Sequence, residues 1–205
     1  MSGLVFPEID PIAIHITENF GIRWYALAYL AGILLGWFYA LKLSDKYKEN
    51  NQRPNREDID SIITWIVLGI ILGGRIGYVL FYNFSEYINH PLEILYVWQG
   101  GMSFHGGFLG VVIAIFAYSK INKISILTLG DIIATVAPIG IFFGRIANFI
   151  NGELFGKVSD VPWAIIFPYG GELPRHPSQI YEAILEGLLL SIILFFMAKS
   201  DKISK

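Results

Sequence analysis

Cysteine is absent from this chain of 205 residues. The absence excludes disulfides, thiolate metal sites and a cysteine nucleophile supplied by the chain itself. The four histidines, His15, His90, His105 and His176, are scattered without the spacing typical of metal ligands. We therefore expect no metal site and no cofactor that needs one.

Charged residues are also scarce. They make up 16% of the chain, whereas soluble domains usually carry about 25%. Hydrophobic residues make up 54%. This balance predicts that lipid surrounds much of the chain. The net charge of −2 gives no indication of a nucleic-acid partner.

The first twenty residues lack the pattern of a signal peptide. They contain Glu8, Asp10 and Glu18, no lysine or arginine, and no apolar run of the required length. We expect the first membrane helix itself to direct insertion.

Five apolar stretches are long enough to cross a bilayer, which takes about 20 residues in a helix. Such lengths exclude transmembrane strands. We predict an all-α, polytopic membrane bundle in a single domain, residues 1–205. The expected spans are Ile22–Leu41, Ile59–Tyr82, Phe104–Ser119, Ile124–Ile150 and Ser178–Ala198.

Lysine and arginine are strongly biased toward one side of this predicted bundle. The loops after the first and third spans and the tail hold ten, and the opposite side holds only Lys157 and Arg175. Because basic residues remain in the cytoplasm, the bias places the N-terminus outside and the C-terminus inside. The ten are Lys42, Lys46, Lys48, Arg53, Arg56, Lys120, Lys123, Lys199, Lys202 and Lys205.

In this orientation all five spans bring polar residues to their outer ends. An arginine within a membrane helix costs about 2.5–3.5 kcal/mol on insertion scales, so it is normally paired or functional. The polar residues expected at the outer ends are Arg23, Tyr25, Arg75, Ser103, His105, Arg145, Asn148, Arg175, His176 and Gln179.

Arg145 is the clearest candidate for binding an anion, because a planar guanidinium can hold a phosphate through two parallel hydrogen bonds. The structural alternative is an arginine that reaches the interface beside an acid such as Glu153. For Arg75, binding and packing both remain open. Glu182 and Glu186 lie four residues apart on one helix face, and we expect them to pair with the membrane arginines.

Asn148 and Asn151 are three residues apart, so they can share one helix face. The pair Asn151–Gly152 is a turn signal, which is compatible with a helix end or with a re-entrant turn.

His105 lies among four glycines between Gly100 and Gly107, where a ligand can approach the backbone closely. An imidazole there suits general-base catalysis, although a lone histidine is often structural. Tyr25 can donate a hydrogen bond to an oxyanion or belong to the aromatic belt beside Trp24.

Four motifs, in this order, resemble the bacterial prolipoprotein diacylglyceryl transferases. The resemblance covers nearly the whole chain. The motifs are Gly73–Tyr78, Gly100–Gly107, Gly144–Glu153 and Arg175–Glu182.

The resemblance implies transfer of a diacylglyceryl group from phosphatidylglycerol to the lipobox cysteine of a lipoprotein precursor. The product is a thioether and glycerol phosphate leaves. The resemblance also implies that Arg145 holds the lipid phosphate with support from Asn148 and Glu153, and that His105 and Tyr25 serve catalysis. We assign Arg75 to the same lipid site. No cofactor is implied, and the site is expected on the outer side of the bacterial cytoplasmic membrane, among its lipids.

The sequence departs from the family pattern at Ala147, Phe155 and Arg23, and it stops at Lys205, where the family normally has two further membrane helices. Two other classes of function are therefore considered. One is a shortened, non-catalytic protein that binds lipid or a partner. The other is a small transporter, which would need polar residues through the full membrane depth, whereas the inner half offers mainly Asp131.

Overall fold

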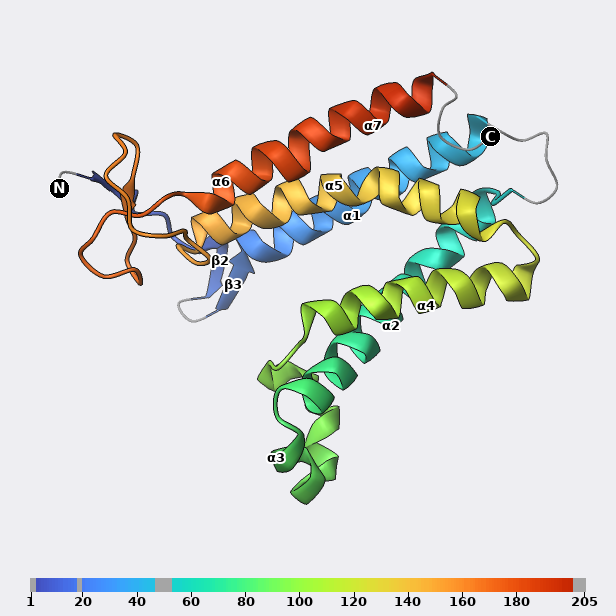
Figure 1. Ribbon diagram of the computed structural model, residues 1–205, viewed down its shortest axis with the longest axis horizontal. Coiled ribbons are helices and arrows are strands. Elements are labelled where there is room, and N and C mark those ends of the chain that lie inside the picture. The colour runs from blue at the N-terminus through green and yellow to red at the C-terminus, as the bar shows by residue number, and fades with distance from the viewer. Residues whose placement is uncertain (1–2, 18–19, 47–52, 201–205) are drawn as a thin grey trace. The chain divides into compact units, whose positions relative to one another are not determined.

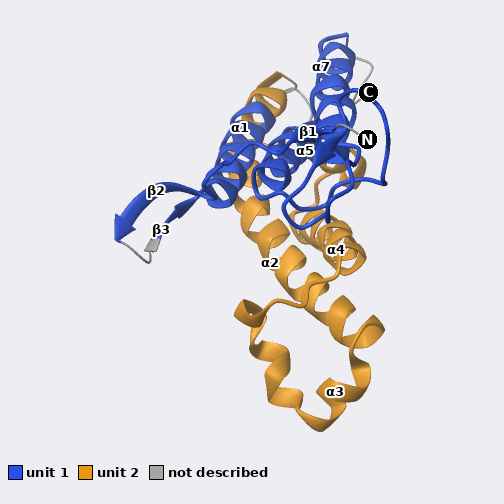
Figure 2. Cartoon of the chain, turned by 90° about the vertical axis from the view of Figure 1, so that its left-hand side faces the viewer, with its two compact units in different colours: residues 1–40, 133–205 blue, residues 41–132 orange. Residues whose placement is uncertain are grey.

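The computed structural model describes residues 3–17, 20–46 and 53–200 (Figure 1). Glu18, Lys48, Lys202 and Lys205, used in the sequence argument, lie outside this description. The chain divides into two compact units, and each is described by itself (Figure 2). Unit 1 comprises residues 1–40 and 133–205, and unit 2 comprises residues 41–132.

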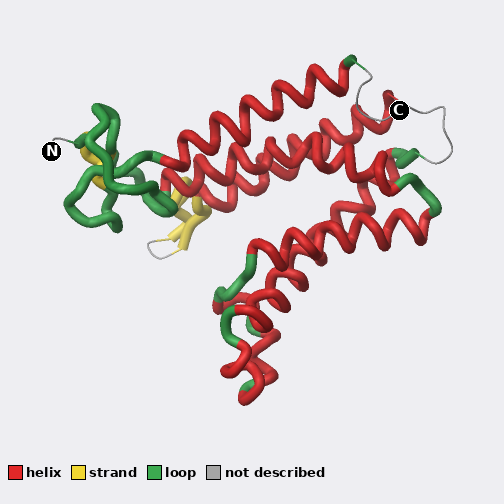
Figure 3. The backbone as a smooth tube through the Cα atoms, viewed as in Figure 1, coloured by secondary structure: helices red, strands yellow, loops and turns green. Residues whose placement is uncertain are grey.

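Among the described residues, five helices are long and apolar enough to cross a membrane, so the predicted polytopic helical fold is confirmed. Figure 3 shows the helices in red. The first four are α1 (Trp24–Lys46), α2 (Arg56–Phe81), α4 (Phe104–Asn122) and α5 (Ile126–Ile150). The fifth runs from Ser178 to Lys199 and comprises α6 (Ser178–Glu182), the π-helical segment η3 (Ala183–Leu189) and α7 (Leu190–Lys199).

Short strands and turns outside these spans were not expected from the sequence. Strand β1 (Leu4–Val5) pairs in parallel with β4 (Ile165–Ile166), and β2 (Ile12–Thr17) pairs antiparallel with β3 (Phe20–Arg23). Between α2 and α4 lie the helix α3 (Phe84–Asn89) and the 3-10 turns η1 (Pro91–Leu95) and η2 (Val97–Gln99).

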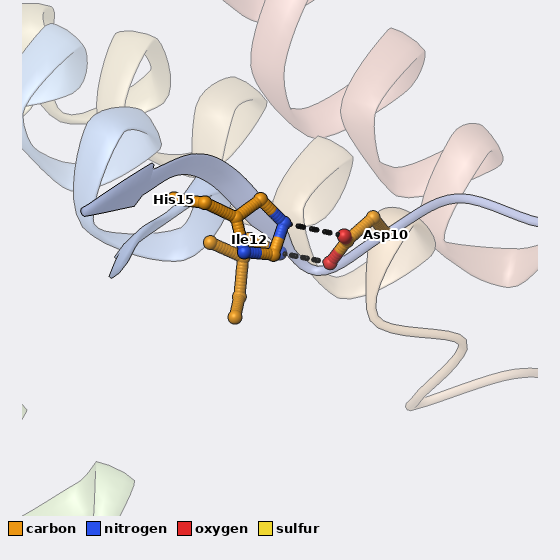
Figure 4. A network of polar contacts seen from close by, with 3 residues as sticks. All are labelled: Asp10, Ile12 and His15. Atoms are coloured by element: carbon orange, nitrogen blue, oxygen red, sulfur yellow. Dashed lines mark hydrogen bonds and ion pairs between the residues drawn. The ribbon is translucent and has the colours of Figure 1, made fainter. Parts of the chain in front are cut away.

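The β2–β3 hairpin begins at a network of polar contacts around Asp10 (Figure 4). Its Oδ1 accepts the Ile12 amide at 2.8 Å, and its Oδ2 lies 2.8 Å from Nε2 of His15. The Ile12 amide first, and then His15, hold the pKa of Asp10 below its ordinary value of 3.8. The contact therefore stabilises the hairpin fully above pH 3.8 and is lost as the pH falls through the lower folded value.

Unit 1 is built on close packing of α1, α5 and the fifth span (Figure 1). A methyl group at Gly32 would lie only 3.0 Å from Cα of Gly140, which places these two backbones in direct contact. Gly187 similarly lies against Phe142, because an added Cβ would be 2.6 Å from the Phe142 Cα. Small residues allow this approach, which provides the van der Waals packing that membrane helices need.

Unit 2 is a close antiparallel pair of α2 and α4. Gly69 faces Gly110, and Gly73 faces Gly106, so glycines four residues apart on each helix form one continuous contact. An added Cβ on Gly69 would lie 2.6 Å from the carbonyl oxygen of Gly110. The spacing is the small-xxx-small pattern of packed membrane helices.

The glycine contact predicts a position-specific effect of alanine on α4. A Cβ at Gly110 would overlap the Gly69 carbonyl and approach its carbon at 2.6 Å, whereas a Cβ at Gly107 would meet nothing closer than 3.6 Å. We expect Gly110→Ala to destabilise the protein by about 1–3 kcal/mol through overpacking. Gly107→Ala, the matched control, should be neutral or stabilising by up to about 1 kcal/mol. Thermal unfolding in detergent measures both, and equal effects of the two substitutions would contradict the packing.

Candidate functional site

The chain turns immediately after α5 ends at Ile150. Gly152 adopts a φ of +66°, which an L side chain rarely adopts. Asn148 Nδ2 donates to Oε1 of Glu153 at 2.8 Å, and Asn151 Nδ2 lies 3.5 Å from the same oxygen. The two asparagines therefore share a face, as their spacing predicted, and the helix-end interpretation of Asn151–Gly152 is confirmed.

Arg145 lies one turn before Asn148 and forms an ion pair with the fifth span. Its Nε is 2.7 Å from Oε2 of Glu182, and both side chains are half-buried. The expectation that Glu182 pairs with a membrane arginine is thus confirmed, and Glu153 is not the partner of Arg145. Among the described residues, no hydrogen bond engages Nη1 or Nη2 of Arg145. Glu182 therefore holds the guanidinium through Nε alone.

The start of the fifth span also holds the turn that follows α5. Gln179 is fully buried, and its Nε2 donates to the carbonyl oxygen of Glu153 at 2.5 Å. Glu182 is the last residue of α6, directly before the π-helical segment. One short helical segment therefore fixes both the Arg145 side chain and the Glu153 backbone.

Tyr25 lies at the start of α1 in the same unit. Its hydroxyl is 3.4 Å from that of Tyr29, and the two ring centroids are 5.0 Å apart. Tyr25 and Tyr29 therefore form an aromatic pair in the first turns of α1.

Aromatic side chains from the N-terminus and from the segment after α5 pack together beside this turn. The Phe6 ring lies 5.4 Å from both Phe149 and Phe167. Phe155 stacks on Phe167 at 5.2 Å, and Arg175 lies 5.2 Å from the Phe155 ring. Pairing of β1 with β4 brings Phe6 to this cluster.

The other two predicted site residues, Arg75 and His105, belong to unit 2. His105 is exposed at the start of α4, with its ring 5.7 Å from that of Phe104. Arg75 is buried, and backbone carbonyls already accept its hydrogen bonds. The other four predicted residues, Tyr25, Arg145, Asn148 and Glu153, belong to unit 1, where the structure joins Asn148 and Glu153 directly by a hydrogen bond.

Sequence reasoning missed the anchoring role of Gln179, although it placed this residue at the outer end. A polar residue at the start of an apolar span was the available signal, but the sequence does not show which backbone carbonyl its amide reaches.

The family described as Prolipoprotein diacylglyceryl transferase matches residues 11–205. The chain belongs to this family. A phosphatidylglycerol–prolipoprotein diacylglyceryl transferase from Rhodospirillum rubrum is 51% identical over 207 residues, which cover 99% of this chain and 73% of the relative. The relative of the same name from Rhodopseudomonas palustris is 53% identical, covering 99% and 72%.

A third relative, from Paramagnetospirillum magneticum, carries the same name and is 54% identical over 197 residues. These residues cover 94% of this chain and 71% of the relative. The family resemblance that the motifs indicated is therefore confirmed, and the family consists of membrane transferases.

The ion pair in this transferase fold predicts energetic coupling between α5 and the fifth span. Because both side chains are about one-third exposed, we expect Arg145→Leu and Glu182→Leu each to destabilise the protein by about 1–2 kcal/mol, less than a fully buried pair. The double variant should lose less than the sum, with a coupling of about 1 kcal/mol. Thermal unfolding in lipid nanodiscs measures this double-mutant cycle on the unaltered protein, the two single variants and the double variant.

Glu186→Leu is the matched control, since Glu186 is exposed one turn further along and has no hydrogen bond or ion pair among the described residues. It should change stability by no more than about 0.5 kcal/mol. Strict additivity of the Arg145 and Glu182 substitutions would show that the pair contributes nothing.

Proposed function

We propose that this protein transfers the diacylglyceryl group of phosphatidylglycerol to the lipobox cysteine of a prolipoprotein, the first step of bacterial lipoprotein maturation. The relatives' shared name pairs phosphatidylglycerol with prolipoprotein. One observation connects the proposal to particular residues: Glu182 holds Nε of Arg145, and neither terminal nitrogen of Arg145 has a hydrogen bond among the described residues. Two parallel N–H groups match two phosphate oxygens.

In this proposal Arg145 holds the lipid phosphate, and Asn148 and Glu153 shape the site around it. Glu153 accepts a hydrogen bond from Asn148, and its backbone is fixed by Gln179. A ligand bound by the Arg145 guanidinium therefore meets a turn whose shape is set before binding. Such preorganisation lowers the entropic cost of binding the headgroup.

The reaction is a displacement at the carbon of the diacylglyceryl group that is bonded to a phosphate oxygen. The cysteine thiol loses its proton to a base, for which we propose His105, and the sulfur forms a C–S bond as the C–O bond breaks. The electron pair of that bond leaves with glycerol phosphate, and Arg145 stabilises the added negative charge. Tyr25 is proposed to donate a hydrogen bond to the reacting lipid. Neither a metal nor an organic cofactor takes part in this scheme.

We propose that the protein lies in the bacterial cytoplasmic membrane with its N-terminus outside and the site facing the outer side. The ten-to-two distribution of lysine and arginine supports this orientation. In this orientation the lipobox cysteine meets the site at the membrane surface, and phosphatidylglycerol reaches it from the surrounding lipid.

The assay combines the purified chain in lipid with phosphatidylglycerol and a lipobox peptide, and mass spectrometry detects the diacylglyceryl thioether. We expect transfer by the unaltered chain and a loss of about 100-fold or more in kcat/KM for Arg145→Ala, corresponding to about 3 kcal/mol of lost charge stabilisation. Arg145→Lys should retain more activity than Arg145→Ala but less than the unaltered chain, because an ammonium is a point charge without two parallel N–H groups.

Glu186→Gln serves as the control for the assay and should transfer normally. If phosphatidylglycerol binds but the peptide gains no mass, while a relative is active in parallel, the chain is a non-catalytic lipid-binding protein. Unchanged phosphatidylglycerol binding by Arg145→Ala would remove Arg145 from the headgroup site.

A further inference from the structure

Arg75 makes an unusual set of contacts for an arginine within a membrane span. Its side chain is 4% exposed, and its three nitrogens form hydrogen bonds only with backbone carbonyls. Nε donates to Ile94 at 2.8 Å and Nη2 to Glu93 at 2.6 Å. Nη1 donates to Gly100 at 2.6 Å and lies 3.2 Å from the carbonyl oxygen of Gly101.

These carbonyls belong to two separate parts of the segment that connects α2 with α4. Glu93 and Ile94 lie in the turn η1, and Gly100 and Gly101 follow η2. Figure 2 shows this connecting segment as an open ring beyond the ends of α2 and α4. Arg75 therefore ties two parts of one loop to the end of α2.

The outward-facing side chains of the connecting segment are largely apolar. Leu92 is 72% exposed and Trp98 is 74% exposed, and the segment from 83 to 103 contains no lysine or arginine. A segment with such a surface meets lipid or its interface, where backbone polar groups need partners within the protein. Arg75 provides that partner for carbonyls in 3-10 and irregular turns, whose own hydrogen bonding is poor.

The same loop leads directly to His105. Gly101, held by Arg75, precedes Ser103 by two residues, and the Ser103 amide donates to the carbonyl oxygen of Gly74 at 2.9 Å. Ser103 Oγ then caps α4 by accepting the Gly106 amide at 3.2 Å. The backbone path from the Arg75 guanidinium to the helical turn that carries His105 is therefore short, and hydrogen bonds hold it at Gly100, Gly101 and Ser103.

We propose that Arg75 is a positioning residue, whose guanidinium closes the 84–103 loop through its carbonyls and thereby fixes the first turn of α4 and His105. In this role Arg75 does not touch the lipid headgroup, which differs from its assignment from the sequence. The consequence for catalysis rests on the proposed function, whereas the ordering of the loop does not.

The test compares Arg75→Lys and Arg75→Gln with the unaltered full chain in nanodiscs by hydrogen exchange. Neither replacement has donors on three separate nitrogens that can reach all of these carbonyls, so amides of residues 84–103 should exchange about tenfold faster or more. Under the transferase assay kcat should fall by a similar factor, while KM for phosphatidylglycerol stays within about twofold. A defect in overall folding would instead accelerate exchange in every helix.

Gly101→Ala tests the same loop without changing Arg75. Its φ is +77°, and an added Cβ would lie 2.6 Å from Cε1 of Tyr78 and 2.9 Å from Nη1 of Arg75. It should loosen the segment as the Arg75 variants do. Glu86→Gln, an exposed change in the same loop, is the control and should leave exchange unaltered.

If loop amides of the Arg75 variants exchange as slowly as in the unaltered chain while KM for phosphatidylglycerol rises tenfold, the proposal is overturned and Arg75 belongs to the headgroup site. If loop amides exchange fast in the Arg75 variants but the unaltered chain shows no transfer, the ordering of the loop by Arg75 is supported and the proposed function fails.

Discussion

A buried or half-buried guanidinium in a membrane helix must find its partners within the protein, and this constraint shapes both units. Arg145 is paired with a carboxylate, Glu182, on another helix. Arg75 is paired instead with the carbonyls of a loop. The two arrangements differ, because neither terminal nitrogen of Arg145 has a hydrogen bond among the described residues, whereas each nitrogen of Arg75 donates to a backbone carbonyl. The same residue type thus serves ligand binding in one proposal and loop closure in the other.

Close helix contacts make these pairings possible. Gly187 lets the fifth span approach α5 at Phe142, near the helical segment from which Glu182 reaches Arg145. In unit 2 the facing glycines of α2 and α4 bring Gly74 within reach of the Ser103 amide. Stability and site geometry consequently depend on the same small residues, so substitutions far from any ligand are expected to affect both.

The spans were predictable from sequence because twenty-residue apolar runs have few structural alternatives in lipid. The pairing of Glu182 with a membrane arginine and the shared face of Asn148 and Asn151 followed from helical spacing. The Arg75 contacts could not be predicted, because backbone carbonyls leave no residue-type signal. The β2–β3 hairpin and its Asp10 contacts were missed although isoleucine recurs at every second position of Ile12–Thr17, because this alternation covers only six residues.

Placement of the polar ends of both units on the outer side of the membrane is the central claim, and the absence of cysteine allows a direct measurement. Single cysteines at Glu86, Glu172 and Glu57, all exposed, can be labelled in intact cells with a membrane-impermeant maleimide. The account predicts labelling at Glu86 and Glu172 without permeabilisation, and at Glu57 only after it. Labelling of Glu57 in intact cells, with protection of Glu86 or Glu172, would contradict the account.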